Sequence, residues 1–401
     1  MSKQHVGHRI SGNAKVVRRI NRSVILNLIR EHQPISRAAI SKLTKLNKGT
    51  VSSIVAELLA ENFVDEELVA DSNVGRNPLL LRLKRGAHFV GAIDIDVGAT
   101  AIGVADIDGN MIETATLETQ PEEAERFIVQ CIERLAGLRA ALNINHLEGV
   151  GVSIAGLVDP AKGLVFISPN LGWKELEVAR IFNQHCRDDG PAFYGNDANA
   201  SALAELWFGD NTQNLSNFVF ISEGIGAGIV IGKKLIEGSF YAAGEFGHMT
   251  IIESGDACPC GNSGCWEVYA SNKSTVSRYN RRRRQDPSDS IATQLRQIIA
   301  QAKAGEPDAI DTLRETGRYL GMGVANIIKA LDPDTIVFGG RIVQAWEIIY
   351  PEIVREVSRR VFFGIKKNTQ ILPTSLKIRS SLIGAATLAI KEIFSGLQIT
   401  S

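Results

Sequence analysis

A short stretch rich in cysteine and glycine, residues 244–267, most constrains how this chain can fold. It reads GEFGHMTIIESGDACPCGNSGCWE and holds three of the five cysteines of the chain. His248, Cys258, Cys260 and Cys265 supply one imidazole and three thiols, a usual ligand set for a tetrahedral structural zinc ion. The alternative is three reduced loop thiols, although small buried side chains rarely cluster among Gly, Pro, Asp and Asn. We therefore predict a structural zinc site.

The composition is that of a globular chain with a sizeable core. Of its 401 residues, 44% are hydrophobic, which is enough for two or three domains. No apolar run approaches the roughly 20 residues of a transmembrane helix, and the N-terminal sequence lacks the apolar core of a signal peptide. We expect a cytoplasmic protein without membrane insertion, in which thiols stay reduced and favour metal binding over disulfides.

Charge is distributed unevenly along the chain. Residues 1–85 carry 15 lysines and arginines against 7 acidic residues, whereas the remainder carries 29 against 37. A basic segment joined to an acidic body indicates that the first segment has a polyanion as its partner.

Residues 21–85 have the pattern of a winged helix-turn-helix domain, preceded by a basic tail at residues 1–20. Apolar spacing predicts three helices, with Ser36 and Asn47 placed to cap the second and the third. Residues 63–83 then alternate as a two-stranded wing. A small packed domain without DNA contacts is the alternative, which the basic charge disfavours. The residues predicted to contact DNA are Ser36, Arg37, Lys48, Thr50, Ser52, Ser53 and, in the wing, Arg76.

From His88 onward, strands and helices alternate. Residues 193–209 predict a strand followed by a helix, which places Asn196 and Asp197 at a carboxyl end of a strand, where α/β folds bind ligands. Residues 217–232 predict two strands joined by a glycine turn, whose backbone N–H groups can approach an anion. The alternation predicts an α/β architecture with a largely parallel or mixed sheet.

Several motifs resemble those of the ROK family of repressors, open reading frames and sugar kinases, over essentially the whole chain. They are Asp96-Val97-Gly98-Ala99-Thr100 (the DxGxT phosphate hairpin of actin-like ATPases), Gly195–Ala200 (a sugar-site turn), Glu245–His248 (ExGH), Cys258–Glu267 (CxCGxxGCxE, zinc) and GRNP at 75–78 in the wing. The resemblance implies an α/β, two-lobed actin-like or ribonuclease-H-like ATPase fold with an N-terminal winged helix-turn-helix domain. The first lobe would comprise residues 86–197 and 383–401, and the second residues 198–382, with the zinc loop 244–267 and an oligomerisation surface.

The same resemblance implies that a sugar binds between the lobes. Asp197 would be the general base if the protein were a kinase, and His248 would both ligate zinc and face the sugar. Several carboxylate and amide groups acting on adjacent hydroxyls are what recognition of a sugar requires. The implied sugar-binding residues are Asn170, Asn196, Asp197, Glu245, His248 and Glu267.

The implied phosphate site departs from the kinase pattern. Kinases of the family usually carry Gly-Thr-Gly where this chain has Ser222-Glu223-Gly224, and Lys where it has Ala101. If Glu223 pointed toward bound phosphates, repulsion at about 4 Å would cost on the order of 4 kcal/mol at an effective dielectric of about 20. We therefore expect that ATP does not bind and that the protein is not an enzyme. The vestigial phosphate residues would be Asp96, Gly98, Thr100, Gly224 and Gly226.

Together these features predict a sugar-responsive DNA-binding transcriptional regulator, a repressor of carbohydrate-utilisation genes. It would bind operator DNA as a homodimer or homotetramer, because paired recognition helices must match paired half-sites. Two alternatives remain open. One is an ATP-dependent sugar kinase of the hexokinase type with a DNA-binding head, and the other is a protein whose partner is a sugar-transport protein.

Overall fold

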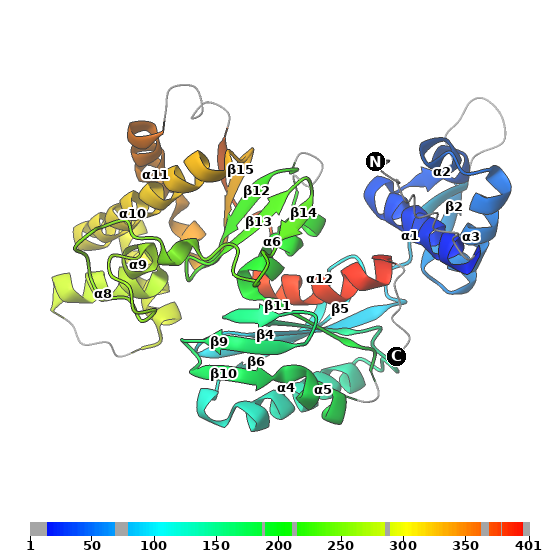
Figure 1. The fold of residues 1–401 in the computed structure, drawn as a ribbon, viewed down its shortest axis with the longest axis horizontal. Coiled ribbons are helices and arrows are strands. Elements are labelled where there is room, and N and C mark those ends of the chain that lie inside the picture. The colour runs from blue at the N-terminus through cyan, green and yellow to red at the C-terminus, as the bar shows by residue number, and fades with distance from the viewer. Residues whose placement is uncertain are drawn as a thin grey trace, which may run out of the picture. The chain divides into compact units, whose positions relative to one another are not determined.

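The computed structural model describes most of the chain, in two compact units (Figure 1). The first unit contains the chain up to Phe89, Asp106–Asp108 and the chain from Ile390 on, and the second contains Val90–Ala105 and Gly109–Ala389. No helix of the described residues is long and apolar enough to cross a membrane. The described residues are 14–68, 79–186, 189–210, 215–284, 289–361, 369–377 and 379–395.

The first unit is built from three helices and a small sheet of order β1-β3-β2, in which both strand pairs are antiparallel. This order of elements is that of a winged helix-turn-helix domain. Its elements are α1 (Ala14–His32), β1 (Ile35–Ser36), α2 (Arg37–Thr44), α3 (Lys48–Ala60), β2 (Val64–Leu68) and β3 (Leu79–Leu83). Its core consists of Ile25, Leu26, Ile29, Ile40, Val51, Ile54, Val55, Leu58 and Leu81.

Local sequence signals place the second and third helices. The hydroxyl of Ser36 accepts a hydrogen bond from the backbone N–H of Ala39 at the start of α2. The side-chain oxygen of Asn47 accepts from the N–H of Thr50 at the start of α3. Both caps are confirmed as predicted, because each satisfies an N–H group that has no partner inside its helix.

The first helix begins earlier than the sequence predicts. The tail predicted for residues 1–20 is wrong for residues 14–20, which form the first turns of α1. Contacts between helices explain the extension, because Arg18 makes an ion pair with Glu57 of α3. The predicted wing tip with Arg76 lies outside the described residues.

The second unit contains two five-stranded sheets with the same strand order. In each sheet three consecutive strands lie side by side, and two later strands extend the sheet in parallel. We call the halves built on these sheets the first and the second lobe. The first sheet, of order β11-β7-β4-β5-β6, consists of β4 (Phe89–Ile95), β5 (Ala99–Asp106), β6 (Met111–Glu118), β7 (Val150–Ile154) and β11 (Ala192–Asn196). The second, of order β14-β13-β12-β15-β16, consists of β12 (Phe218–Ile221), β13 (Ala227–Ile231), β14 (Lys234–Ile236), β15 (Thr335–Phe338) and β16 (Gln370–Pro373).

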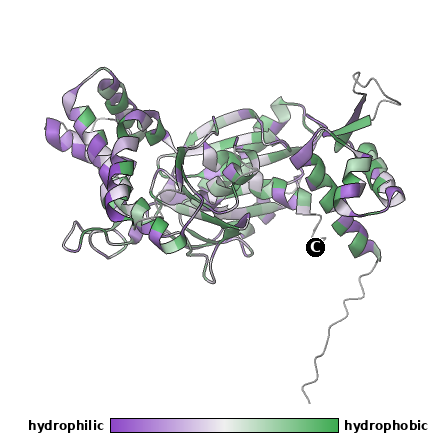
Figure 2. Cartoon of the chain, turned by 90° about the horizontal axis from the view of Figure 1, so that it is seen from above, coloured by the Kyte–Doolittle hydropathy of each residue, from purple (hydrophilic) through white to green (hydrophobic). Residues whose placement is uncertain are grey.

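The remaining elements surround these sheets (Figure 1). In Figure 2 the helices carry hydrophobic and hydrophilic residues side by side, as expected of helices that pack one face against a core. The first lobe adds η1 (Pro121–Glu123), α4 (Ala124–Ala141), the small sheet of β8 (Leu157–Asp159), β9 (Leu164–Ser168) and β10 (Trp173–Glu177), and α5 (Val178–His185). The second lobe adds η2 (Phe246–His248), α7 (Trp266–Ala270), α8 (Asn272–Arg283), α9 (Ile291–Lys303), α10 (Pro307–Leu331), η3 (Arg341–Ala345) and α11 (Trp346–Arg360).

One helix follows the last strand of each lobe. These helices are α6 (Asp197–Phe208), after β11, and α12 (Ser380–Ser395), after β16. They cross in close contact, since a β-carbon at Gly384 would lie only 2.2 Å from the carbonyl oxygen of Ala200. The first turns of α6 and α12 therefore meet near the carboxyl ends of the sheets, where α/β folds hold ligands.

Candidate functional site

Four side chains of the loop between β14 and α7 form a possible metal centre. His248 Nδ1 lies 3.7 Å from Cys258 Sγ, and Cys260 Sγ lies 3.7 Å from Cys265 Sγ. All four ligand atoms lie within 4.8 Å of one another. A tetrahedral zinc ion, with metal–sulfur bonds of about 2.3 Å, separates two thiolates by about 3.8 Å. The group therefore fits zinc in both chemistry and spacing.

Glycine backbone and a buried tryptophan shape this loop. Gly264 has φ +71°, and a β-carbon there would come within 1.7 Å of the carbonyl oxygen of Ile252, so only glycine fits. Trp266, directly after Cys265, is fully buried and donates its indole N–H to the carbonyl of Tyr319 at 2.7 Å. Because Tyr319 belongs to α10, the loop is anchored to the core of the second lobe.

Two of the predicted sugar-binding acids flank the histidine of the metal group. Glu245 Oε2 lies 3.7 Å from His248 Nε2, and Glu267 Oε2 lies 3.8 Å from His248 Nδ1. Burial raises the pKa of both carboxyl groups, while His248 acts in the opposite direction. With Nδ1 also near the sulfur of Cys258, one imidazole connects the metal group to two carboxylates that can bind hydroxyl groups.

Asn196 ends β11 and caps α6, and Asp197 is the first residue of that helix. The side-chain oxygen of Asn196 accepts from the N–H groups of Ala198 and Asn199, at 2.9 and 3.0 Å. Its amide nitrogen donates to the carbonyl of Gly156 at 2.9 Å and to Asp197 at 3.0 Å. Asn196 therefore caps the helix and positions Asp197, with both donors and both acceptor positions of its amide engaged within the protein. A sugar contact by Asn196 stays a prediction.

The Asp197 carboxyl group lies in an acidic environment. Burial first, and then the negative charges of Asp96 and Asp94, raise the pKa of Asp197 to about 8, while Arg379 acts in the opposite direction. A carboxyl group with such a pKa can exchange a proton near neutral pH, which both acid–base chemistry and a pH-dependent hydrogen bond require.

The predicted phosphate hairpin between β4 and β5 is engaged with the protein itself. The Asp96 carboxylate accepts from the guanidinium of Arg379 at 2.7 Å, and Gly98 makes the turn with φ +86°. Thr100 is fully buried, and its hydroxyl bonds to that of Thr119 at 2.9 Å. We therefore correct the assignment of Thr100, because its hydroxyl faces the sheet interior rather than a ligand.

Glu223, in the turn between β12 and β13, points toward Arg341. Its carboxylate accepts from the Arg341 backbone N–H at 2.5 Å and from its guanidinium at 2.6 Å. Gly340 leaves room for this contact, since a β-carbon there would lie 1.9 Å from Glu223 Cγ. The charge of Glu223 is therefore paired with Arg341, and its carboxylate also occupies the backbone N–H of that residue. Of the two predicted glycines of this turn, Gly224 is exposed and Gly226 is half-buried.

Asn170 is exposed in the turn between β9 and β10. Among the contacts of the described residues, no hydrogen bond or ion pair joins it to the other predicted sugar residues. The structure brings Glu245, His248 and Glu267 together around the metal group, and the charge of Asp96 acts on the carboxyl group of Asp197. Sugar recognition by Asn170 stays a prediction.

Several residues predicted to contact DNA are bound within the first unit. Arg37 is held by Glu66 of β2 at 2.7 Å, and Ser53 accepts from Arg18 of α1 at 2.9 Å. We therefore expect Arg37 to stabilise the first unit, because its guanidinium bridges α2 and the sheet. Ser36 is the cap described above. The remaining candidates lie on α3, where Lys48 is exposed and Thr50 and Ser52 are half-buried.

Sequence motifs did not reveal three charged residues beside these sites, namely Asp94, Arg379 and Arg341. Asp94 is fully buried inside the apolar strand β4, and an acidic residue in such a run was the available signal. Arg379 and Arg341 belong to no recognised motif, and their partners Asp96 and Glu223 lie far away in the sequence, so no local pattern reveals these contacts.

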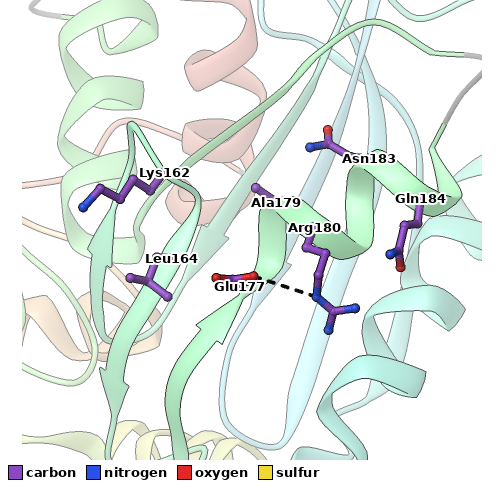
Figure 3. Close-up of a pocket in the computed structure, with 7 residues that line it drawn as sticks. All are labelled: Lys162, Leu164, Glu177, Ala179, Arg180, Asn183 and Gln184. Atoms are coloured by element: carbon purple, nitrogen blue, oxygen red, sulfur yellow. Dashed lines mark ion pairs between the residues drawn. The ribbon is translucent and has the colours of Figure 1, made fainter.

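A separate hollow of about 580 Å³ lies on the first lobe (Figure 3). Glu177 and Arg180 of its lining form a long ion pair at 3.9 Å, drawn as the dashed line. None of the predicted sugar residues lines it, and we assign it no function. Its lining residues are Lys162, Leu164, Glu177, Ala179, Arg180, Asn183 and Gln184.

Comparison with known proteins agrees with the fold. The model of the ROK family matches residues 90–392. A xylose repressor of Bacillus spizizenii is 32% identical over 94% of this chain and 96% of its own length. The crystal structure of a ROK family transcriptional regulator, a homolog of the Escherichia coli MLC protein, has a TM-score of 0.80 and 26% identity, covering 95% of this chain and 98% of that one. A ROK family glucokinase from Streptomyces griseus, in complex with glucose and AMPPNP, has a TM-score of 0.65 and 28% identity, covering 76% of this chain and 99% of that one. The predicted fold class is thereby confirmed.

Proposed function

Because the chain belongs to the ROK family, we propose that it is a transcriptional repressor that binds operator DNA with its first unit and a sugar with its second. The observation that carries this proposal is the presence, in one chain, of a winged helix-turn-helix fold and a metal loop lined by Glu245 and Glu267. Carboxylates can each accept hydrogen bonds from adjacent sugar hydroxyls. A sugar that lacks one of these hydroxyls leaves a buried acceptor without a partner, which costs free energy and disfavours that sugar. The similarity to a xylose repressor supports the proposal and makes xylose the first sugar to test.

The sugar would lie in the cleft between the predicted lobes, residues 86–197 with 383–401 and residues 198–382. Asp197 would accept from one pair of hydroxyls, and the acids beside the metal group from another. The proposed sugar residues are Asn170, Asn196, Asp197, Glu245, His248 and Glu267.

A structural zinc ion would be held by His248, Cys258, Cys260 and Cys265, whose spacing fits it. Bound there, zinc would fix the loop and the orientation of the imidazole, and so the acids on either side of it. Its contribution would be to the shape of the sugar site.

We infer that the protein acts in the cytoplasm as a homodimer or homotetramer, because an operator with two half-sites one helical turn apart requires two recognition helices. Sugar binding would then change the affinity for DNA by changing the spacing of these helices. Co-purification of a sugar-transport protein would instead support a protein partner as the effector.

A sugar kinase is the second candidate, and the similarity to a glucokinase supports it. Two contacts disfavour it: Glu223 occupies the N–H of Arg341, and Arg379 occupies Asp96. Phosphoryl transfer needs free donors around the phosphate and a base on the acceptor hydroxyl. Sugar-dependent ADP release that disappears in Asp197→Asn would establish the kinase.

The deciding experiment is a fluorescence anisotropy titration with DNA selected from a random library, at about 150 mM salt. We expect sequence-specific binding that changes by about tenfold or more with xylose, glucose or N-acetylglucosamine, which corresponds to a coupling of at least about 1.4 kcal/mol. Glu267→Gln should bind the same DNA without the sugar response, whereas Gln184→Ala, in the separate hollow, should behave as wild type. Absence of specific DNA binding would overturn the proposal.

A further inference from the structure

One arginine joins two neighbouring aspartates of the second unit. Arg379, just before α12, makes ion pairs of 2.7 Å with both Asp94 and Asp96. Its guanidinium also donates to the carbonyl of Ala99 at 3.2 Å. Asp197 lies close enough for the charge of Arg379 to affect its pKa. A single cation therefore serves three carboxyl groups.

Asp94 shows that this arrangement is built into the fold. Its side chain is fully buried, and both of its oxygens are satisfied, one by the hydroxyl of Ser153 at 2.6 Å and the other by Ser381 at 2.7 Å and by Arg379. A buried carboxylate is tolerated only with hydrogen bonds and a compensating charge. Among the described residues, Arg379 supplies this charge through its ion pair with Asp94.

The same carboxylates offer what a divalent metal ion prefers, because Mg²⁺ and Mn²⁺ bind to carboxylate oxygens and bridge them to phosphates. A guanidinium differs in that it brings one positive charge and five fixed donors, and it cannot lose its proton in a protein.

We propose that Arg379 is a resident cation that excludes a divalent metal ion, and with it a metal–nucleotide complex, from Asp94 and Asp96. Arg379 is thus a specificity-determining residue, which makes the second unit respond to a ligand without needing ATP. Its contact with Ala99 also ties the hairpin between β4 and β5 to the start of α12. The proposal concerns the protein alone and stands apart from its proposed binding to DNA.

The test is a titration of the full-length protein with Mn²⁺, followed by electron paramagnetic resonance, with thermal unfolding as a second measurement. Arg379→Gln removes the charge and keeps a polar side chain that can donate hydrogen bonds. We expect this variant to gain one Mn²⁺ site, at least about tenfold tighter than any Mn²⁺ binding of the wild type, and to be stabilised by Mn²⁺. Arg379→Lys keeps the charge and should gain no site.

The double variant Asp96→Asn/Arg379→Gln locates the effect. It should lose the Mn²⁺ site that Arg379→Gln gains, because one ligand of the ion is then missing. Equal Mn²⁺ binding by the wild type and Arg379→Gln would overturn the proposal, and so would a site that survives in the double variant. If Arg379→Gln is recovered only in the presence of Mn²⁺, that dependence supports the proposal, since the metal then replaces the missing charge.

Discussion

The hydroxyl of Ser23, in α1, donates to the backbone carbonyl of Phe394, in the last turn of α12 and 371 positions later in the chain. The amide of Asn27 donates to the same carbonyl at 3.0 Å, and the guanidinium of Arg30 lies over the Phe394 ring. Carbonyls of a last helical turn have no partner within their helix, so these side chains cap α12. The end of α12 is therefore part of the first unit.

The first prediction tests this cap. The double variant Ser23→Ala/Asn27→Ala should lower the free energy of unfolding of the first unit by about 1–3 kcal/mol, because two hydrogen bonds are lost and a carbonyl is left without them. Hydrogen exchange of the α1 amides measures it. Ser290→Ala, which removes the cap of α9, is the matched control and should affect only the second unit. Unchanged protection of α1 in the double variant would contradict the prediction.

The second prediction concerns the metal group. Cys260→Ala should lose both bound zinc, measured by mass spectrometry of the metal content, and the response to sugar, because the ion orders the loop that carries Glu245 and His248. Chelation of the wild type should have the same effect. Cys186→Ala, which changes a half-buried thiol of the other lobe, should keep its zinc. Retained sugar binding in a zinc-free variant would show that the metal and the sugar are independent.

The sequence predicts the metal group and the helix caps well because each depends on residues close together in the chain. His248 and Cys265 are 17 positions apart, and the cap at Asn47 needs only the backbone three residues on. Long-range contacts are different, since Arg379 and Asp96 are 283 positions apart and no local pattern connects them.

A sequence motif also does not show whether a side chain already uses its hydrogen-bonding groups within the fold. Asn196 lies in a sugar-site motif, yet the start of α6 and the carbonyl of Gly156 use its whole amide. Thr100 lies in a phosphate motif, yet strand alternation turns its hydroxyl toward Thr119. The motifs identified the right turns of the chain, whereas the fold decided which side chains remain available there.

The third prediction is a pH dependence set by Asp197. Its pKa is about 8 in the folded protein and about 4 in the unfolded chain, so between these values the folded state binds the additional proton. The contribution of Asp197 to stability is therefore fully present below about pH 4 and is lost as pH rises toward 8. Asp197→Asn should gain stability relative to the wild type, by up to a few kcal/mol, between about pH 5 and pH 9. Urea unfolding at both pH values measures the change.

Glu245 and Glu267 also have raised pKa values, but both remain in Asp197→Asn, so the difference between variant and wild type isolates Asp197. In the wild type, the affinity for sugar should rise with pH, whereas the stability contribution of Asp197 falls. Hydroxyl donors favour the ionised carboxylate, so sugar binding releases a proton from Asp197. Calorimetry in two buffers of different ionisation enthalpy detects that proton. A stability difference that is the same at both pH values would contradict the assignment of the raised pKa.

The fourth prediction separates two basic residues of the first unit. Lys48 is exposed in the first turn of α3, where a recognition helix meets phosphates, so Lys48→Ala should weaken DNA binding and reduce the slope of log affinity against log salt by about one. Arg37 is paired with Glu66, so Arg37→Met should lower the stability of the first unit by about 1 kcal/mol or less and leave the salt slope unchanged. Anisotropy titrations at several salt concentrations, with thermal unfolding of each variant, distinguish the two roles. A reduced salt slope in Arg37→Met would show that Arg37 leaves Glu66 to contact DNA.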